Sequence, residues 1–236
     1  PSGISSFYFN FCFFLLFIHF LVLDLDFLQF NSCWGIFSLC SLAGILSVRL
    51  FSSKSPDVAL RFGTIGSAVL FIVLAYFMVT NAGVSAGVWM AVLVGSVGGI
   101  IVGLITEYYT GGAPVRKIAK DGETGPATVM ISGLAVGMES VALPVLTIAA
   151  IIFFANLSAG LYGVGMAAVG MLSTVGITMA IDAYGPVADN AGGIAEMAEM
   201  GEETRENTHR QHEVGNTTAA IGIGFPISAA PIEALA

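Results

Sequence analysis

Charged side chains are scarce in this sequence: Asp, Glu, Lys and Arg make up 10% of its 236 residues, whereas hydrophobic residues make up 56%. An average globular domain carries about 25% charged residues. A soluble protein of this composition would lack the polar surface needed to cover its apolar groups. The scarcity therefore excludes a soluble globular protein and a disordered chain, and it predicts a membrane protein with several spans.

Basic residues, cysteines and histidines are scarcer still. Eight Lys and Arg stand against sixteen Asp and Glu, and the formal net charge of −8 excludes nucleic acid as a partner bound through a basic face. The three cysteines (Cys12, Cys33 and Cys40) show no metal-type spacing, and three histidines are too few for a histidine-rich metal site. We interpret the cysteines as small apolar packing residues.

Long apolar runs are abundant, and a membrane-spanning helix needs about 20 such residues. Glycines recur inside these runs, and in lipid small residues let helices approach closely. The sequence thus predicts an all-α, polytopic transmembrane helix bundle with about six spans, tightly packed. The runs are residues 34–48, 62–80, 86–106, 132–156 and 159–182, a less regular run at Phe7–Leu23 and another that begins near Thr217. The glycines are Gly95, Gly98, Gly99, Gly103, Gly160, Gly163, Gly165 and Gly170.

All basic residues lie in three connecting segments, and the connections near 81–85 and 156–158 contain none. Cytoplasmic loops of membrane proteins carry an excess of Lys and Arg. We therefore expect cytoplasmic loops near 49–61, 107–131 and 183–215, with short turns on the far side of the bilayer.

The first 33 residues differ from the rest, because they are rich in Phe, carry Asp24 and Asp26, and lack the basic region of a signal peptide. The first residue is Pro1 rather than Met. We interpret 1–33 as a poorly defined apolar N-terminal segment, 34–236 as the membrane domain, and the chain as a fragment.

Half of the acidic residues, eight of sixteen, lie between Asp182 and Glu213. Four of them recur at intervals of seven, which places them on one face of a helix. We expect this helix to leave the membrane near Asp182 and to continue outward, with a kink or break at Pro186. The four are Asp182, Asp189, Glu196 and Glu203.

Asp182 and Asp189 lie at the expected membrane boundary, where carboxylates are costly and usually functional. Hard oxygen ligands of this kind suit Mg²⁺, which is often shared with a substrate phosphate. Asn216 opens the next apolar run, and its amide oxygen is a candidate metal ligand facing Asp189. The alternative is a helix cap formed by Asn216 or Thr217.

Glu107 ends an apolar run at the same expected face and is followed by two tyrosines that suit the membrane interface. Either a structural role or membership of a polar network is open for Glu107. Glu139 lies inside an apolar stretch, and we expect its side chain to reach toward the cytoplasmic interface.

Several long strings in this region resemble the membrane-integral, ion-pumping inorganic pyrophosphatases, over about Ser41 to Gly224. They include GLITEYYTGGAPVRKIAKDGETGPATVMISGLAVGMES, DAYGPVADNAGGIAEM and GNTTAAIG. The resemblance implies an all-helical homodimer with about sixteen spans per subunit. It also implies hydrolysis of Mg²⁺-bound pyrophosphate on the cytoplasmic side, coupled to transport of H⁺ or Na⁺. The host membrane would be an acidic-organelle (vacuolar-type) membrane or a prokaryotic plasma membrane.

The resemblance also implies roles for single residues. Asp189 would be an active-site residue that binds the metal–pyrophosphate complex and orients the attacking water, and Asn216 would be a metal ligand. Asp182 and Glu107 are candidates for coupling hydrolysis to ion movement. Ala219 stands where potassium-independent members have Lys, which favours the K⁺-stimulated subclass with K⁺ as activator.

Two departures from the family pattern, Ile223 in place of Lys and Pro226 in an expected helix, affect the last residues. The acidic motifs DxxxDxVGKxE and DxxGDxxKDTxGP are not present in this sequence. We therefore expect the chain to correspond to about the middle third of a pump and to release no phosphate by itself. Two other interpretations are a secondary transporter, which also uses broken glycine-rich helices, and a non-functional relic.

Overall fold

The computed structural model describes residues 36, 39–48 and 56–236. The chain divides into two units, Pro1–Gly35 and Ile36–Ala236, and every described residue belongs to the second unit. The expected run Phe7–Leu23, the segment 1–33, Cys12 and Cys33 lie outside the described residues, as do two basic residues, Arg49 and Lys54. Within the described ranges every regular element is helical, which confirms the all-α prediction.

The first two long helices are antiparallel neighbours. Helix α3 (Pro56–Asn81) is joined to α4 (Ala86–Gly111) by a tight turn in which Gly83 has a φ of 68°. The hydroxyl of Ser85 accepts a bond from the amide of Gly87 and so caps α4. Both helices match runs that the hydrophobic pattern predicts.

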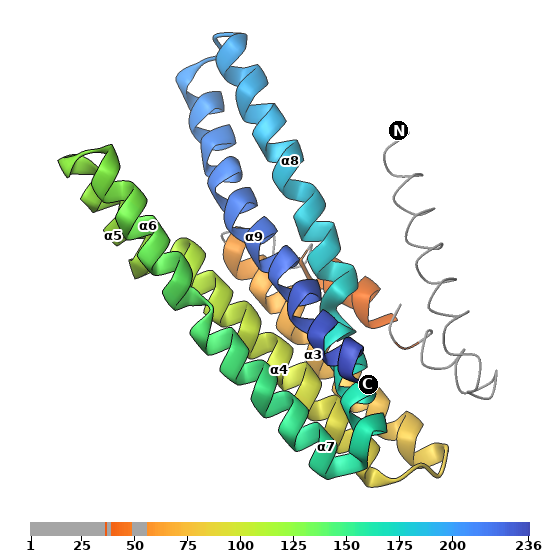
Figure 1. Cartoon of the computed structure of the whole chain (residues 1–236). Helices are drawn as coiled ribbons and strands as arrows, with labels where there is room; N and C mark the ends of the chain where they lie inside the picture. The colour runs from red at the N-terminus through yellow and green to blue at the C-terminus, as the bar shows by residue number, and fades with distance from the viewer. Residues whose placement is uncertain (1–35, 37–38, 49–55) are drawn as a thin grey trace. The chain divides into compact units, whose positions relative to one another are not determined.

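A helical hairpin follows at the far end of α4 (Figure 1). It consists of α5 (Ala113–Asp121), the short 3₁₀ helix η1 (Gly122–Thr124) and α6 (Pro126–Ser140). Proline stands in the first turn of both α helices, where its missing N–H costs nothing. The segment 107–131, expected to be a loop, is therefore largely helical.

The chain then makes a second antiparallel pair. Helix α7 (Ala142–Met171) has non-helical backbone at Ala159 and Gly160, where the chain reverses direction (Figure 1). The reversal lies directly after the turn predicted at 156–158. The 3₁₀ helix η2 (Leu172–Thr174) leads into α8 (Val175–Met197), and α9 (Glu202–Leu235) returns beside α8.

Three helical runs of the described chain are long and apolar enough to cross a membrane: Arg61–Asn81, Ala86–Thr124 and Pro126–Met197. The third contains both predicted spans 132–156 and 159–182, separated by the reversal at Gly160. The predicted span 34–48 is described mainly as the short apolar helix Leu39–Val48.

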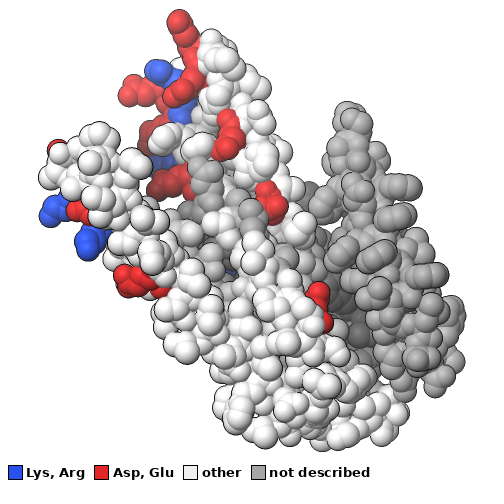
Figure 2. Space-filling view, viewed as in Figure 1, with Lys and Arg blue, Asp and Glu red and all other residues white. Residues whose placement is uncertain are grey.

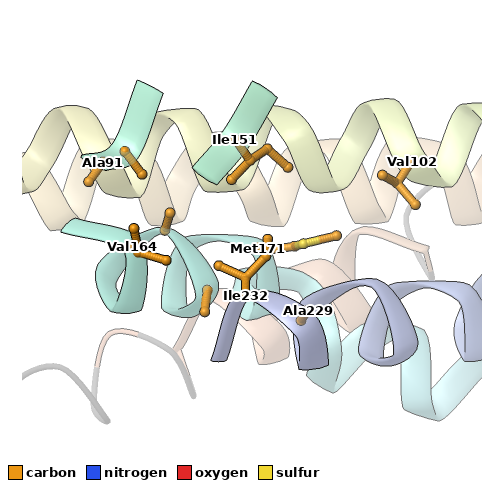
Figure 3. Close-up of a cluster of buried hydrophobic side chains, with 10 residues drawn as sticks. Ala91, Val102, Ile151, Val164, Met171, Ala229 and Ile232 are labelled. Atoms are coloured by element: carbon orange, nitrogen blue, oxygen red, sulfur yellow. The ribbon is translucent and has the colours of Figure 1, made fainter. Parts of the chain in front are cut away.

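Small residues bring α4 and α7 into close contact, as the glycine pattern predicts. A Cβ atom added to Gly95 would overlap the backbone carbonyl of Ala167, and one added to Gly170 would overlap that of Val92. The buried hydroxyl of Ser96 donates a 2.9 Å hydrogen bond to the carbonyl of Gly170. A cluster of buried apolar side chains from α4, α7 and α9 lies beside this contact (Figure 3). Its labelled members are Ala91, Val102, Ile151, Val164, Met171, Ala229 and Ile232.

The structure contradicts two expectations about the acidic stretch. Of the kink or break expected at Pro186, the break is absent, because α8 remains helical from Val175 to Met197, and the kink stays a prediction. The amide of Asn190 donates a 2.7 Å bond to the carbonyl of Pro186 within this helix, and α9 packs along it. The outward extension past Met197 is also wrong, since the chain turns at Glu199, which has a φ of 48°. As a result Glu203 lies on α9 rather than on the α8 face of the other three acids.

Candidate functional site

Charged side chains gather at one end of the bundle (Figure 2). They lie on the α5–α6 hairpin and on the outer part of the α8–α9 hairpin, whereas most of the visible remainder is uncharged. The turns at the opposite end, 81–85 and 159–160, contain no charged residue. This is the segregation that the distribution of Lys and Arg predicts. Assignment of the charged end to the cytoplasm remains a prediction.

Asp189 lies on α8 within this charged end, and a histidine from α9 contacts it. The imidazole Nδ1 of His212 lies against Oδ1 of Asp189, and both side chains are partly exposed, by 42% and 47%. When the imidazole is neutral, this contact requires the proton on Nδ1. The ring of His212 also stacks on that of His209, one turn away on α9, with 6.3 Å between their centroids.

The sequence pattern did not lead us to predict this contact. The signal was available, because Asp189 and His212 lie at similar distances from the turn at 198–201. Two antiparallel helices that meet at such a turn bring equidistant residues together. Because we expected the acidic stretch to form one extended helix, we predicted no turn at this point and no contact between the two residues.

Asn216 lies one helical turn beyond His212 on α9, at the level of Gly185, which is one turn of α8 away from Asp189. The register follows from Gly215, whose Cβ position is 3.0 Å from Cα of Gly185. The helix-cap alternative for Asn216 or Thr217 is wrong, because α9 begins at Glu202 and both residues are inside it. The side chains of Asn216 and Ala219 lie outside the described part, so their predicted roles stay predictions.

No group of three or more His, Cys, Asp and Glu side chains that could hold a metal comes together within the described residues. The carboxylate of Asp189 is a hard oxygen donor of the kind that Mg²⁺ prefers. The role of Asp189 and Asn216 as metal ligands stays a prediction.

Asp182 lies two turns from Asp189 on α8, about 10 Å along the helix axis. It is partly buried against α9, where the Cβ position of Gly222 is 3.2 Å from the Cβ of Asp182. The same position is 3.2 Å from the carbonyl oxygen of Thr178. Only a residue without a side chain fits opposite Asp182 without displacing α8.

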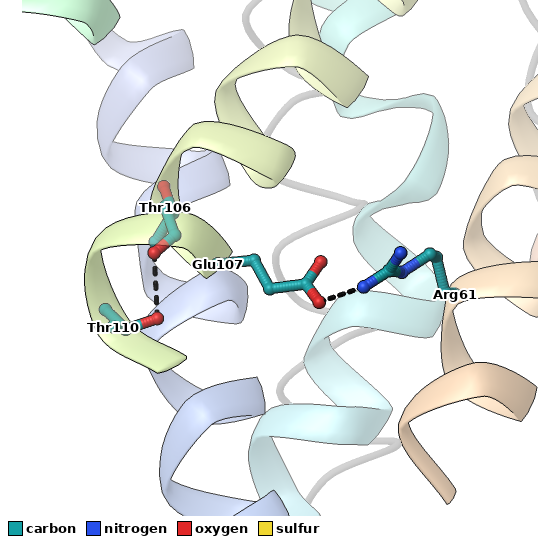
Figure 4. A network of polar contacts seen from close by, with 4 residues as sticks. All are labelled: Arg61, Thr106, Glu107 and Thr110. Carbon is teal, nitrogen blue, oxygen red and sulfur yellow. Dashed lines mark hydrogen bonds and ion pairs between the residues drawn. The ribbon is translucent and has the colours of Figure 1, made fainter. Parts of the chain in front are cut away.

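Glu107 forms an ion pair with Arg61, which links the end of α4 to the start of α3 (Figure 4). Their side chains are 29% and 51% exposed, so solvent screens the pair. On the same turn of α4, Thr110 donates a 2.8 Å bond to the carbonyl of Thr106. The ion pair is a polar contact that also joins two helices, so both interpretations of Glu107 stay open.

Further polar residues line this end of the bundle. The hydroxyl of Tyr109 lies 3.4 Å from the exposed carboxylate of Glu139 on α6. On the α5–α6 hairpin, Ser132 donates a 2.5 Å bond to Asp121, while Arg116, Lys117 and Lys120 are exposed.

Comparison with known proteins identifies similar chains. A family model described as inorganic H⁺ pyrophosphatase matches residues 18–236. The chain is 49% identical over 207 residues to a Clostridium tetani protein whose name assigns it as a K⁺-stimulated pyrophosphate-energized sodium pump, covering 84% of the chain and 31% of that relative. It is 41% identical over 212 residues to the K⁺-stimulated pyrophosphate-energized sodium pump of Thermotoga maritima, covering 83% of the chain and 29% of the relative. It is also 41% identical over 209 residues to the K⁺-insensitive pyrophosphate-energized proton pump 2 of Moorella thermoacetica, covering 82% of the chain and 31% of that relative. The chain thus spans about three tenths of the length of the curated relatives it matches.

Proposed function

The chain belongs to the inorganic H⁺ pyrophosphatase family, and on that premise we propose that it forms part of a pyrophosphate-energised ion pump. In this pump, hydrolysis of pyrophosphate at the charged end of the bundle drives H⁺ or Na⁺ across the membrane. The observation that carries the proposal is the position of Asp189: its carboxylate contacts His212 across the α8–α9 hairpin, and the same helix α8 carries Asp182.

Asp189 acts on the attacking water in this proposal. Its carboxylate accepts a hydrogen bond from the water, orients it toward phosphorus and takes its proton as the P–O bond forms. His212 holds the carboxylate in one orientation through the contact at Oδ1. Asp189 and Asn216 would hold Mg²⁺, which when bound would neutralise negative charge on the phosphate groups.

Asp182 links this site to ion movement. It lies on the same helix as Asp189, so a displacement of α8 during hydrolysis moves both residues. Its contact with Gly222 transmits the displacement to α9. Glu107 is the second coupling candidate, since its pair with Arg61 joins α3 and α4 at the level where the charged end begins.

The subclass is proposed from Ala219 and from the relatives. Ala at this position favours K⁺ as an activator, and the relatives from Clostridium tetani and Thermotoga maritima are named K⁺-stimulated sodium pumps. Na⁺ is accordingly favoured over H⁺ as the transported ion. We further propose that the charged end faces the cytoplasm and that the complete protein is a homodimer in an organelle or prokaryotic plasma membrane.

A chimera tests the proposed function. The matched segment of the Thermotoga maritima relative is replaced by the corresponding segment of this chain, reconstituted in liposomes and assayed for phosphate release and ion uptake. Asp189→Asn removes the proton acceptor, and we expect hydrolysis to fall about 100-fold or more. The matched control, Glu206→Gln, changes an exposed carboxylate on α9 and should leave hydrolysis unchanged. A chimera that assembles but keeps its activity after Asp189→Asn contradicts the assigned role.

The same chimera separates coupling from chemistry. Asp182→Asn should lower ion uptake per phosphate released, because Asp182 is two turns away from the hydrolytic carboxylate. Unchanged uptake and unchanged hydrolysis would reject the coupling role. The 236-residue chain alone should release no phosphate above background from Mg²⁺-pyrophosphate.

A further inference from the structure

The helix break η2 lies in the interior of the bundle. Its residues Ser173 and Thr174 are each 1% exposed, and η2 contacts α3, α4, α7 and α9. A 3₁₀ segment inside a long helical run often marks a functional position. Two hydroxyl groups are therefore placed where neither bulk water nor lipid reaches them.

Three buried hydroxyl oxygens of the described chain have no hydrogen-bond partner, and all three belong to η2 or its surroundings. They are Oγ of Ser41, Oγ of Ser173 and Oγ1 of Thr174. Serine and threonine in helices normally bond to a carbonyl of the preceding turn. The other buried hydroxyls of the described residues do bond to carbonyls: Ser67 to Thr64, Ser96 to Gly170, Thr178 to Thr174, and Ser228 to Gly224. The three near η2 forgo this bond, although burial makes an unpaired hydroxyl costly.

Gly176 places one of these hydroxyls against the break. A Cβ atom at this position would overlap Oγ of Ser41, so Ser41 approaches the first turn of α8 only because residue 176 is glycine. Ser173 and Gly176 are three residues apart across the junction of η2 and α8, and residues three apart are neighbours on a helix surface. Ser41, whose hydroxyl lies against Gly176, therefore approaches the side of the chain from which Ser173 projects.

We propose that the break η2 binds a small ligand coordinated by the hydroxyl oxygens of Ser41 and Ser173, either a water molecule or a monovalent cation. Hydroxyl groups both donate and accept, which suits a buried water with two to four polar partners. These hydroxyl ligands are neutral, so they suit neither an anion nor a divalent cation, which would require carboxylates. The binding itself is independent of pyrophosphate hydrolysis.

Thermal unfolding of the full chain in detergent tests the site, because the expected change in Tm has a different sign for an occupied site and for an empty one. If a ligand is bound, Ser41→Ala and Ser173→Ala each remove one of its partners, and we expect Tm to fall by about 2–4 °C. If nothing is bound, the same substitutions remove an unpaired hydroxyl, and Tm stays the same or rises. The second result overturns the proposal. Ser228→Ala is the matched control for a buried serine that bonds only to its own helix.

A double-mutant cycle tests whether Ser41 and Ser173 share one ligand. If both residues bind the same molecule, the first substitution already abolishes its binding, so the second has little further effect. The decrease in Tm of the double variant should then be smaller than the sum of the decreases of the two single variants. Additive losses would reject a shared ligand. This result does not depend on catalysis, and a failed activity assay would leave it unchanged.

Salt composition distinguishes the two ligands. Unfolding is measured in NaCl, KCl and choline chloride at equal ionic strength. A Tm increase specific to Na⁺ or K⁺, lost in Ser173→Ala, identifies a cation at η2. Equal Tm values in the three salts, combined with destabilisation by Ser173→Ala, identify water.

Discussion

The α4–α7 interface and the α8–α9 hairpin are both built around glycines, but the helices approach each other to different degrees. In the first, a Cβ added to Gly95 or Gly170 would overlap a backbone carbonyl oxygen of the opposite helix, which cannot move independently of that helix. In the second, Cβ atoms added to Gly215 and Gly222 would lie 3.0 and 3.2 Å from their nearest neighbours on α8. The first interface therefore has no room for a side chain at these positions, whereas the second would accept one after small displacements.

Charge separates the two regions further. The buried cluster beside α4 and α7 contains only apolar side chains, while the hairpin carries Asp182, Asp189 and His212. Helix α9 takes part in both, because its last turns contribute Ala229 and Ile232 to the cluster and its first half pairs with α8. The comparison indicates a rigid apolar scaffold that holds one end of a more polar, more adjustable helical pair.

The largest effect is expected at the α4–α7 contact. Gly95→Ala places a methyl group on the carbonyl of Ala167, and because neither backbone can yield, we expect a loss of about 3 kcal/mol in the free energy of unfolding. The measurement is chemical unfolding in detergent followed by circular dichroism. Gly133→Ala on α6 is the control, since a Cβ there meets no atom within 4 Å and should stabilise the helix by about 0.5–1 kcal/mol. Equal effects at the two glycines would contradict the backbone contact.

A smaller effect is expected in the hairpin. Gly222→Ala crowds Asp182, but the contact distance of 3.2 Å is relieved by a slight shift of α8, and the gain in helix propensity opposes the strain. We expect a net loss of about 1 kcal/mol or less. Gly193→Ala, which meets no atom within 4 Å, is the matched control on α8. A loss as large as that of Gly95→Ala would show that the hairpin is as rigid as the scaffold.

The scaffold is the region that the sequence predicts well. Uninterrupted apolar runs identify α3 and α4, and the glycines within α4 predict close helix packing, although not which helix is the partner. These signals are local, because apolar length and residue size act within a single helix. At Pro186 a kink or break was expected; the break does not occur, and packing against α9 accompanies a continuous helix.

The hairpin was harder to predict because its key feature is a turn without a strong signal. The residues at 198–201 contain a single glycine, and the heptad pattern of acids favoured a continuous helix. Without that turn, the pairing of Asp189 with His212 has no basis in the sequence. The break η2 was also hard to predict, since it contains neither glycine nor proline. The burial of its hydroxyl groups depends on four helices packed around it.

The smallest effect is expected at the ion pair between Glu107 on α4 and Arg61 on α3. Glu107→Gln removes the ion pair with Arg61, which is screened by solvent, and we expect a loss of about 0.5 kcal/mol that shrinks further in high salt. Glu206→Gln breaks the more exposed pair with Arg210 within one turn of α9 and serves as the control, with a loss of about 0.3 kcal/mol or none. Because Arg61 and Glu107 lie on different helices, their pair constrains the α3–α4 arrangement, whereas the pair on α9 constrains only its own helix. A loss above about 2 kcal/mol for Glu107→Gln would mean that the membrane shields this ion pair from water. The pair would then contribute to the rigid scaffold.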